Sequence, residues 1–346
     1  MDRAAARTTV ALTDETAEGK RPTTQPLDWS GVLAQQGYVF GVDISAESQR
    51  VALADVHGSI VGSASNGAGA LTLDPATVVE HVSGMMRDLL EKGGIKQREV
   101  LRVGVGFGGP VDAARGLVRR SHDAAIWNDY PLAAEIESRL DAPTFLENDA
   151  RLAALGEVWF GAGRDTPECD LVYIHWSTGV GGGIVTSGRL LSGATTIAGE
   201  VGHTAVRTGE GALPCRCGSK GHLEAYVRGP ALIERTRALG GGRDPRTVAD
   251  VFTLSSADPE VQALVDEAAH LMGITAANLI TAINPNILVI GGRVAREASP
   301  LIPRIAEIAR EYAMPVSMQG VEVVPTTLGD EATLMGALAL ALDKLR

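Results

Sequence analysis

The sequence has few cysteines, a deficit of basic residues and no long apolar run, and each shortage excludes a class of protein. Three cysteines cannot form a disulfide framework, so we expect a cytoplasmic protein. The 31 basic and 42 acidic residues give a net charge of -11, which argues against a direct nucleic-acid surface. No apolar run has the length of a membrane span, and the N-terminus lacks the apolar core of a signal peptide.

Glycine is abundant instead, and apolar segments of strand and helix type alternate. The 346 residues suffice for two domains, and the 41 glycines indicate tight turns and close backbone approaches. We expect a flexible leader at 1–36, an N-terminal α/β lobe at 37–143 and a C-terminal α/β lobe at 144–331. A C-terminal helix at 332–346 is expected to pack back on the first lobe.

The period of the apolar residues predicts the individual elements. Strands are expected at 39–44, 50–55, 60–65, 101–106, 144–147, 171–176, 182–185, 287–290 and 321–324. Helices are expected at 75–92, 149–159, 230–239, 259–283, 300–312 and 332–345.

Two stretches have the pattern of glycine- or polar-turned hairpins. GVDISAESQRVALADV at 41–56 places a short polar turn between two apolar strands, the first of which is closed by Asp43. WSTGVGGGI at 176–184 has four glycines in five positions, more than the one or two that an ordinary turn needs. Such a run can direct backbone N–H groups at an anion, so we predict phosphate binding there, although it is not a Walker loop.

Asn148 and Asp149 stand where an apolar strand meets a helix in FLENDARLAALGE, 145–157. Taken alone, a helix N-cap explains either residue. Beside a phosphate loop, an aspartate at the carboxyl end of a strand becomes a candidate general base. A similar strand end at Gly291 and Gly292, in NPNILVIGGRVA, is a ligand-cleft position, although any α/β domain contains such turns.

The segment 198–226 carries four nitrogen and sulfur ligands of the kind that suits a closed tetrahedral zinc site. The Cys-x-Cys spacing is not that of a zinc finger, and the alternative is two buried thiols with two surface histidines. Because the segment is rich in glycine and lacks an apolar core of its own, we favour a metal that holds it together. The four residues are His203, Cys215, Cys217 and His222.

Together these motifs resemble the ROK family, named for repressors, open reading frames and kinases. GFGGPVD, END, STGVGGG, GEVGH, CRCGSKGHLE and VIGGRVA occur in the family's order from Tyr38 to the C-terminus. The resemblance implies an α/β fold of the actin-like ATPase (ribonuclease-H-like) class, with two lobes and a central cleft for ATP and a sugar.

The resemblance also implies roles for the matching residues. Asp149 would be the general base that takes the proton of the attacking sugar hydroxyl, and Mg²⁺ would accompany ATP. His222 stands where the family has a third cysteine, so a structural Zn²⁺ site can survive as Cys2His2. The implied sugar contacts are Gly108, Gly109, Asn148, Glu200, His203 and Glu224. The implied nucleotide contacts are Asp43, Thr178, Gly179, Gly181, Gly182, Gly183, Gly291 and Gly292.

Two positions depart from the family's kinases. The first hairpin reads Asp-Ile-Ser-Ala-Glu where kinases read Asp-x-Gly-Gly-Thr, so Glu47 replaces a threonine. A carboxylate ~4 Å from a phosphate charge costs ~4 kcal/mol at an effective dielectric of ~20, unless Glu47 points away or helps to hold Mg²⁺. Asp123 replaces an asparagine near the sugar, which suggests an amino sugar or another altered ligand.

The sequence therefore predicts a glucokinase-like enzyme that phosphorylates a hexose or a sugar-like cyclitol with ATP. The alternative is a sugar-binding regulator derived from the family's repressors. It would lack their DNA-binding module, for which residues 1–36 are too few, and Glu47 would impair its catalysis. A third hypothesis is a chain without a selected activity. The expected partners are a small-molecule sugar and further copies of the chain, as a dimer or tetramer, with no membrane and no direct nucleic acid.

Overall fold

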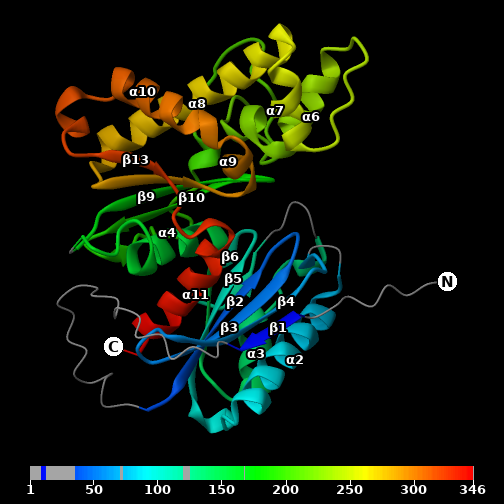
Figure 1. The fold of residues 1–346 in the computed structure, drawn as a ribbon, viewed down its shortest axis with the longest axis vertical. Coiled ribbons are helices and arrows are strands. Elements are labelled where there is room, and N and C mark those ends of the chain that lie inside the picture. Colours follow the sequence, from blue (N-terminus) through cyan, green and yellow to red (C-terminus); the bar gives the residue numbers. More distant parts are fainter. Residues whose placement is uncertain (1–8, 13–35, 71–72, 120–124, 167, 346) are drawn as a thin grey trace. The chain divides into compact units, whose positions relative to one another are not determined.

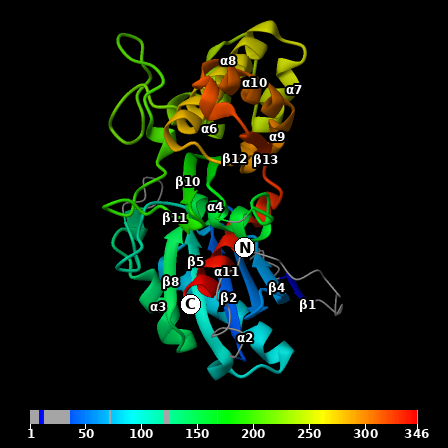
Figure 2. The same cartoon turned by 90° about the vertical axis from the view of Figure 1, so that its left-hand side faces the viewer.

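The computed structural model describes residues 9–12, 36–70, 73–119, 125–166 and 168–345, and the chain divides into two compact units (Figures 1 and 2). Each unit has its own sheet and its own hydrophobic core. Unit 1 consists of Met1–Pro167, Ser192–Ala198 and Glu331–Arg346, and unit 2 of Glu168–Leu191 and Gly199–Asp330.

Unit 1 is built on a six-stranded sheet in which the three strands β2, β5 and β8 run parallel. The other neighbouring pairs are antiparallel. Short hairpin connections require this for β2 with β3 and for β3 with β4. In sheet order the strands are β1 (Thr9–Leu12), β4 (Ile60–Asn66), β3 (Gln49–Asp55), β2 (Tyr38–Ile44), β5 (Val100–Phe107) and β8 (Thr144–Asn148). A two-stranded ribbon, β6 (Val111–Asp112) with β7 (Leu117–Val118), follows β5.

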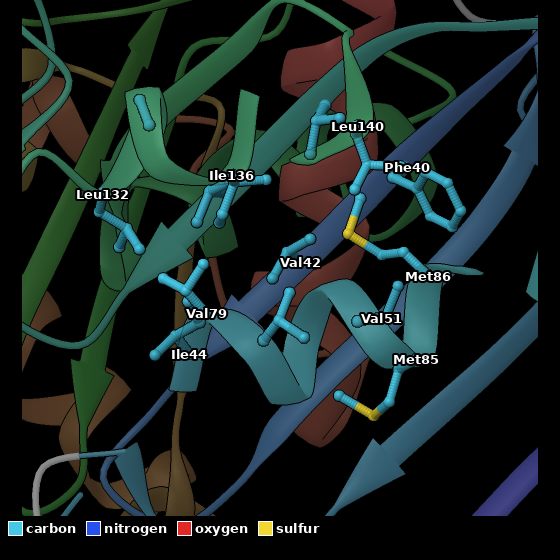
Figure 3. Close-up of a cluster of buried hydrophobic side chains, with 14 of the residues drawn as sticks. Phe40, Val42, Ile44, Val51, Val79, Met85, Met86, Leu132, Ile136 and Leu140 are labelled. Carbon is cyan, nitrogen blue, oxygen red and sulfur yellow. The ribbon is translucent and has the colours of Figure 1, made fainter. Parts of the chain in front are cut away.

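One face of this sheet is covered by α2 (Pro75–Gly93) and α3 (Leu132–Leu140). Figure 3 shows their apolar side chains pointing toward those of β2 and β3, with Met86 and Ile136 among them. Alternate residues of a strand point to opposite faces, so Phe40 and Val42 enter this core while Gly41 faces the other side.

The other face carries α11 (Ala332–Asp343), which packs against β2 and β5 and alongside α4 (Asp149–Phe160). The approach is close because glycine stands at the contacts. A Cβ at Gly41 would lie 2.7 Å from Leu338 Cγ, and one at Gly336 would overlap the carbonyl of Leu152. The end of the chain thus completes a unit whose strands begin near its start.

Unit 2 is a mixed five-stranded sheet covered by helices, of which the 25-residue α8 is the longest. In sheet order its strands are β11 (Arg189–Leu190), β10 (Val180–Thr186), β9 (Leu171–Trp176), β12 (Ile287–Gly291) and β13 (Glu322–Pro325). Its helices are α5 (Glu224–Val227), α6 (Gly229–Ala238), α7 (Val248–Ser255), α8 (Pro259–Ile283), α9 (Arg293–Glu297) and α10 (Ile302–Tyr312).

The structure has the α/β class that the sequence predicts, and it changes the expected boundaries. The expected second lobe begins at 144, yet β8 pairs with β5 and α4 packs on α11, so the chain passes to unit 2 only at Glu168. Within the expected leader, residues 9–12 form β1, because the outer edge of β4 offers backbone groups that a further strand can pair. The remainder of the leader up to residue 35 lies outside the described residues. None of the helices in the described part is long and apolar enough to cross a membrane.

Candidate functional site

Three parallel strands end at the same edge of the unit 1 sheet. Ile44 of β2 lies opposite Phe107 of β5, which lies opposite Asn148 of β8. The residues after these strand ends therefore become neighbours. Gly108 N donates to Ile44 O at 3.0 Å, and a Cβ at Gly108 would lie 3.4 Å from Asp149 Oδ2. The sequence-predicted Gly108, Asn148 and Asp149 are thus brought together.

Asp149 is half-buried at the first position of α4, and its neighbours fix one of its two oxygens. Oδ1 accepts hydrogen bonds from Ala150 N at 2.8 Å and from Asn148 Nδ2 at 3.0 Å. Burial raises the pKa of Asp149 to about 6, and these hydrogen bonds only partly oppose the rise. The carboxylate can therefore take up a proton close to neutral pH.

Asn148 acts as the N-cap of α4 and ties this corner together. Its Oδ1 accepts from Arg151 N at 3.2 Å, and its Nδ2 also donates to Gly109 O at 3.1 Å. The N-cap and the general-base interpretations of this pair are compatible, because the cap residue orients the aspartate that follows it.

The first hairpin, between β2 and β3, is closed on itself by Ser45. The Ser45 hydroxyl accepts from Ser48 N at 3.1 Å and from Glu47 N at 3.4 Å, and it donates to Ser48 O at 3.0 Å. The turn also leans on the next segment, where Ala70 N donates to Ser45 O. Two of the N–H groups that a phosphate loop would direct at a ligand are thus bonded within the turn, while the Glu47 side chain is exposed.

Arg50 lies directly opposite Asp43 in the hairpin and binds one oxygen of its carboxylate. Arg50 Nη2 and Nε donate to Asp43 Oδ2 at 2.5 and 3.0 Å, and Nη1 donates to Glu331 at 3.0 Å. Asp43 is only 2% exposed, so this charge-assisted pair is shielded from solvent. Both donors reach Oδ2, and the same guanidinium also binds Glu331, so one cation is shared by two carboxylates.

In unit 2 the second glycine run lies in a strand more than in a turn. Residues 180–185 of β10 pair in regular register with β9, which leaves 177–179 as the turn. A Cβ at Gly182 would lie 2.9 Å from Val201 Cγ2, so the 3-10 turn Val201–His203 can pack tightly only on glycine. Backbone packing therefore accounts for Gly182 without a ligand.

Packing also accounts for the two glycines after β12. A Cβ at Gly291 would overlap the Tyr173 hydroxyl, and one at Gly292 would lie 2.6 Å from Trp176 O. Gly292 has a φ of +98°, which other residues rarely adopt. Both glycines stand at the carboxyl edge of the unit 2 sheet, so a nucleotide role for them stays a prediction.

Four potential metal ligands gather in the loop between β11 and α5. One ligand atom from each of His203, Cys215, Cys217 and His222 lies within 4.8 Å of all the others. His203 Nδ1 is 3.5 Å from Cys215 Sγ, and His222 Nδ1 is 3.3 Å from Cys217 Sγ. In a tetrahedral zinc site the ligand atoms lie roughly 3.4 to 3.8 Å apart, as Zn–N and Zn–S distances of about 2.1 and 2.3 Å require. The donor set and its spacing fit Zn²⁺.

His203 can serve two partners, because its nitrogens face different groups. Its Nδ1 faces the cysteine, while its Nε2 lies 3.8 Å from Glu200 Oε2. Glu224, 6% exposed at the start of α5, accepts from Val180 N at 3.1 Å through Oε2. Arg216 Nη2 and Nε donate to the other oxygen at 3.2 and 3.3 Å.

The predicted residues therefore form two groups, one in each unit. Asp123 lies outside the described residues. Sequence reasoning missed Arg50 and Arg216, the two cations that bind predicted carboxylates. A signal existed for Arg50, since a hairpin turning at 45–48 places it opposite Asp43. The residues of the first group are Asp43, Gly108, Gly109, Asn148 and Asp149, and those of the second are 178–183, Glu200, His203, Cys215, Cys217, His222, Glu224, Gly291 and Gly292.

Known proteins are similar to this chain in sequence and in fold. A glucokinase of Halalkalibacterium halodurans is 34% identical over 249 residues, which cover 68% of this chain and 74% of that protein. A xylose repressor of Caldicellulosiruptor bescii is 26% identical over 282 residues, 77% of this chain and 69% of that protein.

Solved structures agree with these relatives. The ROK hexokinase of Thermus thermophilus superposes with a TM-score of 0.75 at 30% identity, covering 89% of this chain and 99% of that one. A ROK family glucokinase of Streptomyces griseus, in complex with glucose and AMPPNP, gives a TM-score of 0.69 at 29% identity, covering 89% and 100%. The expected actin-like ATPase fold is thereby confirmed. The family pattern of ROK matches residues 39–344, nearly all of the two units that carry these motifs, and the chain belongs to the ROK family.

Proposed function

We propose that the protein phosphorylates a hexose or a sugar-like cyclitol with ATP, using Asp149 as general base. The observation that carries the proposal is a half-buried carboxylate at the end of a parallel strand, with a pKa of about 6 and one oxygen held by Asn148. Such a group is matched to taking a proton from a hydroxyl at neutral pH. The similarity to glucokinases and to a ROK hexokinase supports the same reaction class.

In the proposed reaction Asp149 Oδ2 takes the proton from the sugar hydroxyl while that oxygen attacks the γ-phosphorus. The new O–P bond forms as the bond to the β-phosphate oxygen breaks, and ADP leaves. Asn148 keeps the carboxylate in place by donating to Oδ1. The proposed sugar contacts are Gly108, Gly109, Asn148, Glu200, His203 and Glu224, and the proposed nucleotide contacts are Thr178, Gly179, Gly181, Gly182, Gly183, Gly291 and Gly292.

Mg²⁺ would supply charge neutralisation on the phosphates. Asp43 stays a proposed nucleotide contact on the first hairpin; Arg50 binds it through Oδ2, and we assign it no step.

The proposal is tested by sugar-dependent ADP release with Mg-ATP. The panel contains glucose, mannose, fructose, N-acetylated and amino hexoses and a cyclitol, with Asp149→Asn as the inactive control. Turnover that disappears in the control supports the kinase. Turnover that persists in Asp149→Asn contradicts the role of the base, and no turnover with any sugar contradicts the kinase.

A second candidate, a sugar-binding regulator without phosphoryl transfer, is favoured by the closed first hairpin. The Ser45 hydroxyl accepts hydrogen bonds from two N–H groups of the turn, and Arg50 binds Asp43. These groups are therefore not directed at a nucleotide. The similarity to a xylose repressor is consistent with it. A sugar that raises the melting temperature of a protein without turnover would support this reading.

We further infer a structural Zn²⁺ held by His203, Cys215, Cys217 and His222. The ion would cross-link the loop between β11 and α5, and so would hold His203 and Glu224 in place. From the family we also infer a dimer or a tetramer. From the composition we infer a cytoplasmic location and no direct binding of nucleic acid.

A further inference from the structure

Arg216 stands between the two cysteines of the metal loop, and its side chain leaves the loop to reach Glu224. The loop turns tightly at this point, since Cys215 N donates to Ser219 O at 2.8 Å and Gly218 N donates to Cys215 O at 3.0 Å. Both residues next to Arg216 in the chain are potential metal ligands. An ion bound there would fix the backbone on both sides of the arginine.

The guanidinium holds Glu224 through two nitrogens. Nη2 and Nε lie 3.2 and 3.3 Å from Oε1, while Val180 N holds Oε2. The carboxylate is therefore held at both oxygens, in a single orientation. Arginine suits this task better than lysine, because its rigid fork presents two donors at once.

The same contact reaches the turn before β10. A Cβ at Gly179 would lie 3.2 Å from Glu224 Oε2 and 3.7 Å from Arg216 Nη2. The arginine, the glutamate and the glycine turn are therefore in mutual contact. A displacement of Arg216 would therefore change the orientation of the Glu224 carboxylate and its contact with the turn at Gly179.

We propose that Arg216 is a positioning residue that transmits the state of the metal loop to Glu224 and thereby sets the affinity for one sugar hydroxyl. This rests on the proposed function, which takes Glu224 as a sugar contact. The metal orders the loop, the loop orders Arg216, and Arg216 orients the carboxylate that the sugar meets.

Titration calorimetry with glucose and mannose, and with their singly deoxygenated analogues, tests the proposal. In the wild-type protein the analogue that lacks the hydroxyl bound by Glu224 should bind about tenfold or more weakly. Arg216→Ala should bind the parent sugar about tenfold more weakly than the wild type does. In this variant, removal of that hydroxyl from the sugar should lower the affinity only about twofold to threefold.

Two further variants separate positioning from a general loss of structure. Arg216→Lys keeps the charge without the fork and should fall between the wild type and Arg216→Ala. Lys220→Ala removes the same charge from the same loop and should bind every analogue as the wild type does. If Arg216→Ala weakens the parent sugar and all analogues by one common factor, the arginine does not position Glu224, and the proposal is wrong.

Removal of zinc provides an independent readout. Chelation should weaken sugar binding more in the wild-type protein than in Arg216→Ala, kept folded as judged by circular dichroism, because the variant can lose only the contribution of His203 and not that of a positioned Glu224. Equal losses in both proteins would overturn the coupling. A wild-type protein that binds no member of the full panel of hexoses and cyclitol would overturn the proposed function and this inference together, whereas unchanged binding in Arg216→Ala would overturn the inference alone.

Discussion

At the scale of single residues, two arginines that lie within the quoted motifs, but have no role in them that the sequence indicates, bind acidic groups of the candidate sites. Arg50 neutralises Asp43 across a hairpin, and Arg216 holds Glu224 from a neighbouring loop. The motifs identify the carboxylates because their spacing along the chain is regular. The partners are harder to find, because Arg216 meets Glu224 only through the folding of the loop between them. Local spacing thus predicts which groups are present, and tertiary contacts decide what they are bound to.

The pKa of Asp149 predicts an acid limit for catalysis. With a pKa of about 6 in the folded protein, the Asp149 carboxylate can accept a proton above that pH, whereas below it the group is already protonated and cannot act as a base. We expect kcat/KM for sugar phosphorylation to fall about tenfold per pH unit below pH 6. Rates of ADP release between pH 4.5 and 8.5 measure this profile. A rate that stays flat down to pH 5 would contradict the assignment of Asp149 as the base.

The same burial predicts that Asp149→Asn stabilises the protein at pH 7.5. The pKa rises from 3.8 to about 6 on folding, so the folded state binds a proton more tightly than the unfolded state and is destabilised above pH 6. The neutral amide should recover roughly 1 to 3 kcal/mol of the free energy of unfolding. This gain in stability should decline as the pH falls from 6 to 4. Thermal melts measure it, and Asp88→Asn, at an exposed position on α2, is the control. A gain that is unchanged at pH 4 would argue against burial as its cause.

At the scale of elements, the apolar period predicts most strands and helices to within two residues, including α8 with both its ends. Several features escape it, among them the nine-residue helix α3, which is not among the expected helices. The edge strand β1 is specified by its partner β4, and the short α7 has too few turns to show a clear period. The glycines of 181–183 suggest a phosphate loop, yet they lie in β10, because close packing of two backbones needs the same residue as close approach of a ligand.

The first hairpin can be opened by restoring the residues that the family's kinases carry. The combined variant Ser45→Gly, Ala46→Gly, Glu47→Thr and Arg50→Ala removes the hydroxyl that takes the turn's N–H groups and the cation on Asp43. Affinity for Mg-AMPPNP, measured by calorimetry, should rise at least tenfold, since the loss of Glu47 alone removes a repulsion of up to ~4 kcal/mol. Arg87→Ala, an exposed ion-pair partner on α2, is the control and should change nothing. An unchanged affinity in the combined variant would mean that the hairpin does not limit nucleotide binding.

The contact between α11 and α4 should tolerate no side chain at Gly336. A methyl group there would overlap the Leu152 carbonyl, which belongs to the backbone and cannot rotate away. We expect Gly336→Ala to lower the free energy of unfolding by about 2 to 3 kcal/mol. Gly84→Ala on α2 is the matched control, because no atom lies within 4 Å of its added Cβ and alanine favours a helix by about 1 kcal/mol. Urea titrations of both variants decide the matter, and equal stabilities would refute the close contact.

At the scale of the whole molecule, two cores in one chain predict two separable unfolding events. The metal loop lies in unit 2 and the α11–α4 contact in unit 1. In scanning calorimetry, chelation of about one zinc per chain should lower the transition of unit 2, while Gly336→Ala should lower that of unit 1. A chelator that moves both transitions equally, or a protein that contains no zinc, would contradict this assignment.

The position of α11 has a consequence for how the protein is made. The sheet of unit 1 is complete once residue 148 has left the ribosome, but the helix that covers one of its faces begins only at Ala332. At about 5 to 20 residues per second, the face bearing Gly41 and Gly104 waits roughly 10 to 40 s for its cover. During that interval the nascent chain presents an apolar surface to the cell. A stop codon ahead of the codon for Ala332 would make that exposure permanent, so the codons of α11 protect the sheet of unit 1 from aggregation.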